Sequence, residues 1–185
     1  MNVEDKVAIF EVELSFIHNE VIREFAKLCI GAAPDYLFYD CPASSTGKFH
    51  PMDELAGDGT VIHTKKVFTL AYELSRGLDV ESHRDEILAA CLIHDLLKQG
   101  KKKVGHTATQ HPKLAAELVE EVQAATQMLS EETFSIIRNC VLHHYGPWSM
   151  KEIRKPLKEY SMEELCVYVS DFVASKRPVQ VNYRR

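Results

Sequence analysis

The 185-residue sequence has few of the features that mark secreted or membrane-spanning proteins. Its five cysteines are scattered without a C-x-x-C pair, and three of them, Cys91, Cys140 and Cys166, stand within apolar helical patterns. This usage indicates reduced packing residues rather than a disulfide framework. No run of about 18 apolar residues occurs, and the first residues begin an amphipathic pattern rather than a leader. We therefore expect a cytoplasmic protein with no membrane partner.

Excess positive charge and strand patterns are also lacking. The net charge is −5, and the basic residues form only one cluster, at Lys101–Lys103, so duplex DNA is not an expected partner. No segment alternates convincingly between apolar and polar residues, and no internal repeat is visible. With 45% hydrophobic and 26% charged residues, the length suits one well-packed domain. The sequence predicts a single all-α domain over residues 1–185.

Helical periodicity divides this domain into three parts. Residues 1–30 repeat apolar side chains every three or four positions, which predicts one long amphipathic N-terminal helix. Residues 31–60 lose that period and contain several prolines and glycines, which predicts a long ordered loop. Connections longer than about 12 to 15 residues tend to be functional in compact domains. Residues 61–177 regain the helical period and are expected to form the core.

An adjacent histidine and aspartate lie inside the apolar helical stretch Ile87–Lys98, ILAACLIHDLLK. Apolar residues surround the expected helix, so His94 and Asp95 cannot both face bulk water. An isolated buried carboxylate is strongly disfavoured unless it is paired or bound to a metal. Asp95 therefore predicts a nearby cation, which is either an ion or a side chain. For this dipeptide alone, a core aspartate bonded to lysine or histidine is the simpler interpretation.

Other histidines and a second aspartate favour a metal ion, rather than a side chain, as the cation near Asp95. These residues lie in or at the ends of five helical segments, next to apolar positions: His63, His94, Asp95, His111, His143, His144 and Asp171. Packing alone gives little reason to place so many imidazoles and two carboxylates inward. Imidazole and carboxylate ligands without thiolate suit Mn, Fe, Co, Ni or Zn better than Mg or Ca. The pattern predicts a divalent transition-metal site in the core.

The loop segment Ser44–His50, SSTGKFH, superficially resembles a phosphate-binding loop. It does not fit the Walker A motif, because Pro42 stands at the first glycine position and Phe49 follows the lysine. Two interpretations remain open, a plain polar turn and an anion-binding loop. On the second interpretation, the substrate-binding candidates are Ser45, Thr46, Lys48 and His50.

The order of these residues resembles the HD-domain metal-dependent phosphohydrolase superfamily over residues 42–176. Its marks here are an upstream histidine, His-Asp followed by x-x-Lys, further histidines and a downstream aspartate. The resemblance implies a helical bundle in which one metal is held by His63, His94, Asp95 and Asp171. In family members with two metals, the aspartate bridges to a second ion, here bound by His111 and His143. It also implies that His144 is an outer-shell or substrate group, and that the catalytic residues are Asp95 and Lys98, with Lys98 and Lys48 holding phosphate.

The implied reaction is hydrolysis of a phosphomonoester or phosphodiester in a small substrate, a nucleotide or short oligonucleotide. Metal binding lowers the pKa of a bound water from 15.7 toward about 7, which provides hydroxide at neutral pH. Two alternatives stay open at this stage. One is a di-iron oxygenase of the same fold, and the other is a non-catalytic regulatory module that binds metal.

Overall fold

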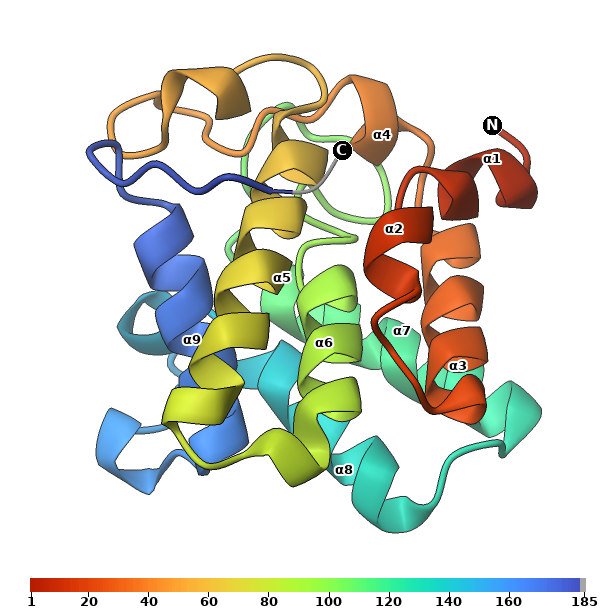
Figure 1. Ribbon diagram of the computed structural model, residues 1–185. Coiled ribbons are helices and arrows are strands. Elements are labelled where there is room, and N and C mark those ends of the chain that lie inside the picture. The colour runs from red at the N-terminus through yellow and green to blue at the C-terminus, as the bar shows by residue number, and fades with distance from the viewer. Residues whose placement is uncertain (184–185) are drawn as a thin grey trace.

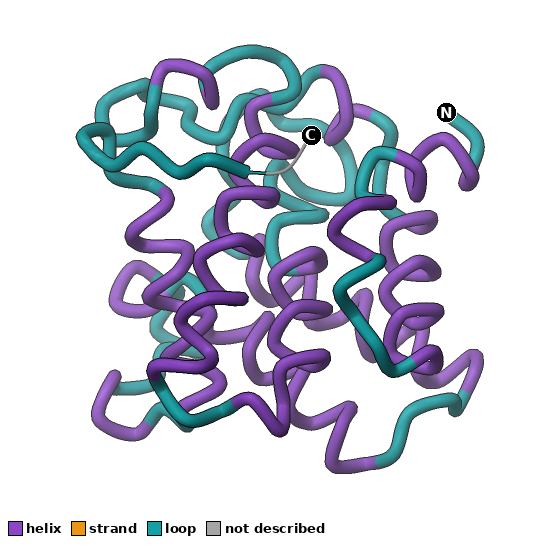
Figure 2. The backbone as a smooth tube through the Cα atoms, in the orientation of Figure 1, coloured by secondary structure: helices purple, strands orange, loops and turns teal. Residues whose placement is uncertain are grey.

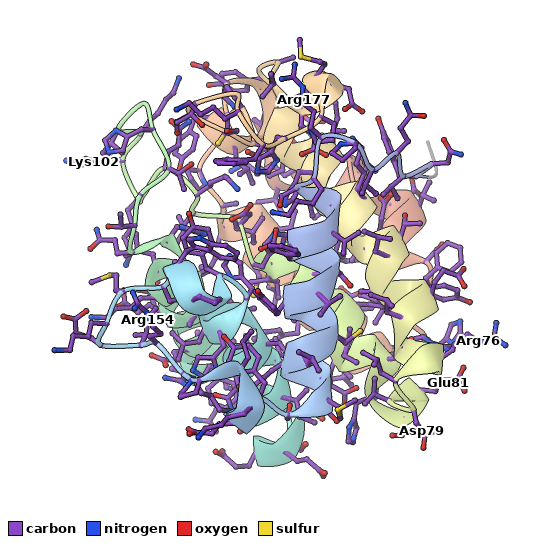
Figure 3. All side chains as sticks on the ribbon, turned by 90° about the vertical axis from the view of Figure 1, so that its left-hand side faces the viewer. Arg76, Asp79, Glu81, Lys102, Arg154 and Arg177 are labelled. Atoms are coloured by element: carbon purple, nitrogen blue, oxygen red, sulfur yellow. The ribbon has the colours of Figure 1, made fainter. Side chains whose placement is uncertain are left out.

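The computed structural model describes residues 1–183, which form helices joined by loops without a strand (Figure 1, Figure 2). The all-α prediction is confirmed. Charged side chains such as Arg76 and Arg154 project outward from the bundle (Figure 3). The larger helices are α3 (Glu20–Ala32), α5 (Gly59–Gly77), α6 (Arg84–Ile93), α7 (His111–Thr126), α8 (Glu131–His143) and α9 (Met162–Ala174), and the short ones are α1 (Val3–Ala8), α2 (Glu11–Leu14) and α4 (Tyr36–Tyr39).

The prediction of one continuous helix over residues 1–30 is wrong, because this region divides into α1, α2 and α3. The chain leaves α2 after Leu14 and restarts at Asn19, whose side-chain oxygen accepts hydrogen bonds from the backbone N–H groups of Val21 and Ile22. Asn2 caps α1 in the same way. At the break before α3, the cap at Asn19 outweighs the continuous apolar period. The breaks still leave Phe10 and Ile17 buried in the core.

Helix α6 is the centre of the bundle. Every residue from 86 to 93 is buried, and α6 contacts α3, α5, α8 and α9. A helix that is apolar on all sides is stable in water only when other helices cover it on all sides. The helix is shorter than the stretch Ile87–Lys98 suggests, since α6 ends at Ile93 and consecutive turns follow. His94 and Asp95 therefore lie just beyond its last turn, at the level where α5 begins.

The predicted long loop is ordered, and it covers the first turn of α5 (Figure 1). It contains α4 and a 3₁₀ turn at Met52–Glu54. A backbone hydrogen bond from Ala43 N to Glu54 O at 2.9 Å joins two parts of the loop, and one from Thr60 N to Cys41 O at 2.9 Å holds the loop on the helix. A Cβ on Gly59 would lie 1.9 Å from the carbonyl oxygen of Glu54, so only glycine allows this approach. The loop thereby reaches the part of α5 that carries His63.

Candidate metal centre

Six side chains from α5, α6, α7, α8 and α9, or from the residues next to these helices, meet in the core. They are His63, His94, Asp95, His111, His144 and Asp171. All are buried except the half-buried Asp171. The structure thus brings together five of the six residues that the sequence predicts as metal ligands, and adds His144.

The ligand atoms form two adjoining groups. His63, His94 and Asp171 make one group, and Asp95, His111 and His144 make the other. Within each group, one potential ligand atom from every residue lies within 4.8 Å of the others. The ring centroids of His94 and His144 are 4.9 Å apart, so the two groups are neighbours.

Three histidine rings are oriented by the same backbone contact. In each, Nδ1 lies 2.7 Å from the carbonyl oxygen of the residue three positions earlier, which pairs His94 with Cys91, His111 with Ala108 and His144 with Val141. A carbonyl oxygen only accepts, so each Nδ1 carries the proton and each Nε2 keeps a free lone pair. Neither His94 Nε2 nor Asp95 Oδ1 has a hydrogen-bond partner among residues 1–183.

Lone pairs converge in the second group. The Nε2 atoms of His111 and His144 are 3.0 Å apart, and Asp95 Oδ1 lies 3.3 Å and 3.7 Å from them. Burial lowers the pKa of His111 to about 4 and that of His144 to about 3, so both rings are neutral near pH 7. Neutral imidazoles and a carboxylate that face one another can hold a cation between them. This donor set fits a divalent transition metal.

Lys98 holds the other oxygen of Asp95. Its ammonium forms an ion pair with Asp95 Oδ2, and both residues are buried. Burial acts to raise the pKa of Asp95, but the positive charge of Lys98 outweighs it and holds that pKa well below its usual value. Asp95 is therefore ionised, with one oxygen on Lys98 and the other free for a ligand bond.

Glu54 belongs to the site, although the sequence analysis missed it. Its fully buried Oε2 accepts hydrogen bonds from Nδ1 of His50 at 2.6 Å and of His63 at 3.1 Å, while Lys66 Nζ lies 2.9 Å from Oε1. Burial disfavours charge on His63, but the bonds to Asp171 and Glu54 outweigh it and raise the pKa of His63 to about 9. Because Lys66 already neutralises Glu54, we assign this carboxylate to orienting His63. A glutamate in an irregular loop has no periodicity that would have identified it.

The predicted ligand His143 lies outside both groups, and its assignment to the second ion is corrected. Its Nδ1 hydrogen-bonds Glu164 Oε1 on α9 at 2.5 Å, and its carbonyl accepts from the Tyr160 hydroxyl. Consecutive residues of a helix point about 100° apart, so only one of two adjacent histidines faces the centre. That histidine is His144, which the sequence analysis had given to the substrate or the outer shell.

An open cleft of about 460 Å³ leads to the ligand cluster. The loop supplies Ser45, Thr46 and His50 to its wall, and Ser45 Oγ accepts a hydrogen bond from the backbone N–H of Thr107 at 2.7 Å on the opposite loop. Lys48 is exposed and does not line the cleft, so its predicted phosphate contact is not supported. The other lining residues, which are not among the predicted site residues, are Ala43, Ser44, Phe49, His106, Thr107, Tyr145, Trp148, Tyr168, Phe172, Ser175 and Lys176.

A helical bundle that buries histidines and aspartates in its core defines a class of metal-binding all-α domains. The family model for the HD domain matches residues 60–175, and the chain belongs to that family, within the HD-domain metal-dependent phosphohydrolase superfamily. Neither the curated proteins nor the solved structures include a match to this chain. Within residues 1–183, no helix has the length and apolar character needed to cross a membrane.

Proposed function

We propose that this protein is a metal-dependent phosphohydrolase that cleaves a phosphoester in a small substrate of the nucleotide class. One observation carries the proposal. The Nε2 atoms of His111 and His144, 3.0 Å apart, and the unpartnered Oδ1 of Asp95 converge beside an open cleft. A ligand set that touches such a cleft is accessible to substrate, as a catalytic metal site requires and a closed structural site does not.

The residues divide naturally between two ions. His63, His94 and Asp171 would hold one, and Asp95, His111 and His144 the other. A bound Mn, Fe, Co, Ni or Zn ion would lower the pKa of water at this site and so supply a hydroxide nucleophile near neutral pH. Glu54 keeps the His63 ring in place through Nδ1, as outer-shell carboxylates do for metal-bound histidines.

Cationic side chains around the cleft favour an anionic substrate. Lys98 lines it, and although burial acts to lower the pKa of Lys98, Asp95 outweighs burial and keeps that pKa raised, so the ammonium stays charged. Lys176 lines the same cleft, as do the hydroxyls of Ser45 and Thr46. These groups suit the oxygens of a phosphate.

The test starts from metal-depleted protein that is reloaded separately with Mn, Fe, Co, Ni or Zn. Bound metal is measured by elemental analysis, phosphate release from a panel of nucleotides and sugar phosphates by a colorimetric assay, and oxygen uptake with an electrode. We expect phosphate release that depends on metal and is lost in Asp95→Asn. Oxygen uptake without phosphate release would establish an oxygenase instead. Metal binding with neither activity, across all five metals, would establish a non-catalytic module.

A further inference from the structure

An aromatic shelf forms one wall of the cleft. We use this name for Trp148, Phe172 and Tyr168. The rings of Trp148 and Phe172 stack with centroids 5.6 Å apart and an interplanar angle of 13°, and Phe172 stacks on Tyr168 at 6.0 Å and 30°. Trp148 is nevertheless 54% exposed, on the wall of a cleft. A large flat apolar surface left open beside a buried ionic site is suited to cover by a flat ligand.

Lys176 adds a positive charge to this shelf. Its Nζ lies 3.6 Å from the ring centroid of Phe172 and 5.9 Å from that of Trp148. The ammonium therefore sits over the aromatic stack while lining the cleft. A purely aliphatic ligand would make no use of this cation, whereas a heteroaromatic ring offers it ring nitrogens and carbonyl oxygens as well as a π face.

One ring separates the shelf from the ligand cluster. The centroid of Tyr145 lies 4.8 Å from that of His111 and 6.3 Å from that of Trp148, and all three residues line the cleft. A ligand that reaches from the cluster to the shelf must therefore have three parts in a row. These are an anionic end, a linker about the size of one ring, and a flat aromatic end.

The segment between the cluster and Trp148 packs closely against the shelf. Gly146 has a φ of +57°, and a Cβ on it would lie 2.3 Å from the ring of Tyr168. The segment that joins the ligand His144 to Trp148 is thus packed directly against the shelf. The distance between the anionic end and the aromatic end of a ligand is set by this packing.

We propose, resting on the phosphohydrolase function above, that the shelf binds the base of a nucleoside 5′-monophosphate. The base stacks on Trp148, the pentose lies beside Tyr145, and the phosphate lies next to Lys98 and the ligand cluster. The cleft volume of about 460 Å³ falls in the ordinary range for a small-molecule site and suits one nucleotide unit rather than a longer strand. Trp148 is a positioning residue in this arrangement.

Trp148 is the only tryptophan of the chain, so its fluorescence reports this wall alone. The purified protein with its metal is titrated with the non-hydrolysable phosphonate analogue of adenosine 5′-monophosphate and, in parallel, with that of ribose 5-phosphate. We expect saturable quenching by the first and none by the second. Base stacking on an aromatic residue predicts that Trp148→Leu weakens binding of the nucleotide analogue about tenfold to a hundredfold in calorimetry. Trp148→Phe should retain most of the affinity, and both variants should keep the metal content of the parent.

Failure of this inference can be told apart from failure of the proposed function. Equal affinity of Trp148→Leu and parent for the nucleotide analogue would overturn the shelf, even if phosphate is released from other substrates. Tenfold tighter binding of a short single-stranded oligonucleotide than of the mononucleotide analogue would also overturn it. If no substrate releases phosphate but the analogue still quenches the parent protein and binds Trp148→Leu more weakly in calorimetry, the shelf stands and the phosphohydrolase proposal fails.

Discussion

The carboxylate of Glu54 accepts a hydrogen bond from Nδ1 of His63, and Nε2 of the same ring lies 2.9 Å from Asp171 Oδ1. The hydrogen bond to Glu54 fixes both the tautomer and the orientation of the His63 ring, which is a proposed metal ligand. Outer-shell partners of this kind contribute about tenfold to a hundredfold to metal affinity. We expect Glu54→Gln to weaken metal binding by such a factor, measured by competition with a chelator.

Asp53→Asn is the matched control for Glu54→Gln. Asp53 also pairs with Lys66, at 2.8 Å, but its side chain is half exposed, and within residues 1–183 it forms no hydrogen bond or ion pair with a histidine. We expect the control to keep the metal affinity of the parent. Equal affinity in both variants would mean that Glu54 does not orient a ligand.

Metal stoichiometry distinguishes the two adjacent histidines. Removing His144 deletes a ligand atom from the second group, so His144→Ala should bind one ion fewer than the parent at saturating metal. His143→Ala leaves both groups intact and should keep full stoichiometry, while losing some stability with its bond to Glu164. Elemental analysis of both variants tests this. The opposite pattern would restore His143 as the ligand.

Replacing one lysine in the cleft and one on the exposed loop tests which of them contacts the phosphate. Lys98 lines the cleft and is charged, whereas Lys48 is exposed and lies outside it. Charged hydrogen bonds contribute about 1.5 to 3 kcal/mol, so Lys98→Met should lower kcat/KM about tenfold to a hundredfold. Lys48→Met should change it less than threefold. A large loss at Lys48 and none at Lys98 would place the phosphate on the loop instead.

The stability of the metal-free protein should be greatest near pH 6.5. Folded His63 has a pKa of about 9 against 6.5 for an unperturbed histidine, so its contribution is complete below pH 6.5 and is lost as pH rises to 9. That loss is on the order of 3 kcal/mol. The pKa values of His111 and His144 are about 4 and about 3, so the unfolded chain binds protons first and stability falls as pH drops below 6.5.

Urea unfolding of chelator-treated protein across this range provides the free energy of unfolding at each pH. Bound metal displaces the proton of His63, so the decrease between pH 6.5 and 9 should shrink in the metal-loaded protein. An unfolding free energy that keeps rising from pH 6.5 to 9 without metal would contradict the raised pKa of His63.

Two glycines should respond oppositely to alanine. Gly146 combines a φ of +57° with close contact to Tyr168, so Gly146→Ala should lower the free energy of unfolding by about 1 to 3 kcal/mol. Gly77 closes α5 with nothing within 4 Å of an added Cβ, and Gly77→Ala should be neutral or stabilise by up to about 1 kcal/mol. Urea unfolding measures both. A neutral Gly146→Ala would show that the shelf accommodates the extra atom.

The sequence by itself determined the helical class, the buried character of α6 and five of the six residues in the ligand cluster. Each of these features depends on the pattern of residues within one segment of the sequence, or on the sum of such patterns. Apolar period predicts a helix, and buried histidines and aspartates among apolar residues predict a cation, wherever the helices later pack. The capping box at Ser161 and Glu164, which begins α9, is likewise local, because both residues stand within one helical turn of the sequence.

Only the tertiary structure decided the rest. The choice of His144 over His143 depends on the rotation of α8 about its own axis, which adjacent residues in a sequence cannot reveal. Glu54 reaches His63 because an irregular loop crosses the start of α5, and Trp148 meets Phe172 because the segment after α8 packs on α9. The break between α2 and α3 followed from the cap at Asn19, which outweighed a continuous apolar period. The contacts join residues far apart in the chain, and the helix breaks depend on small differences between local energies. Hydrophobic periodicity predicts neither of them.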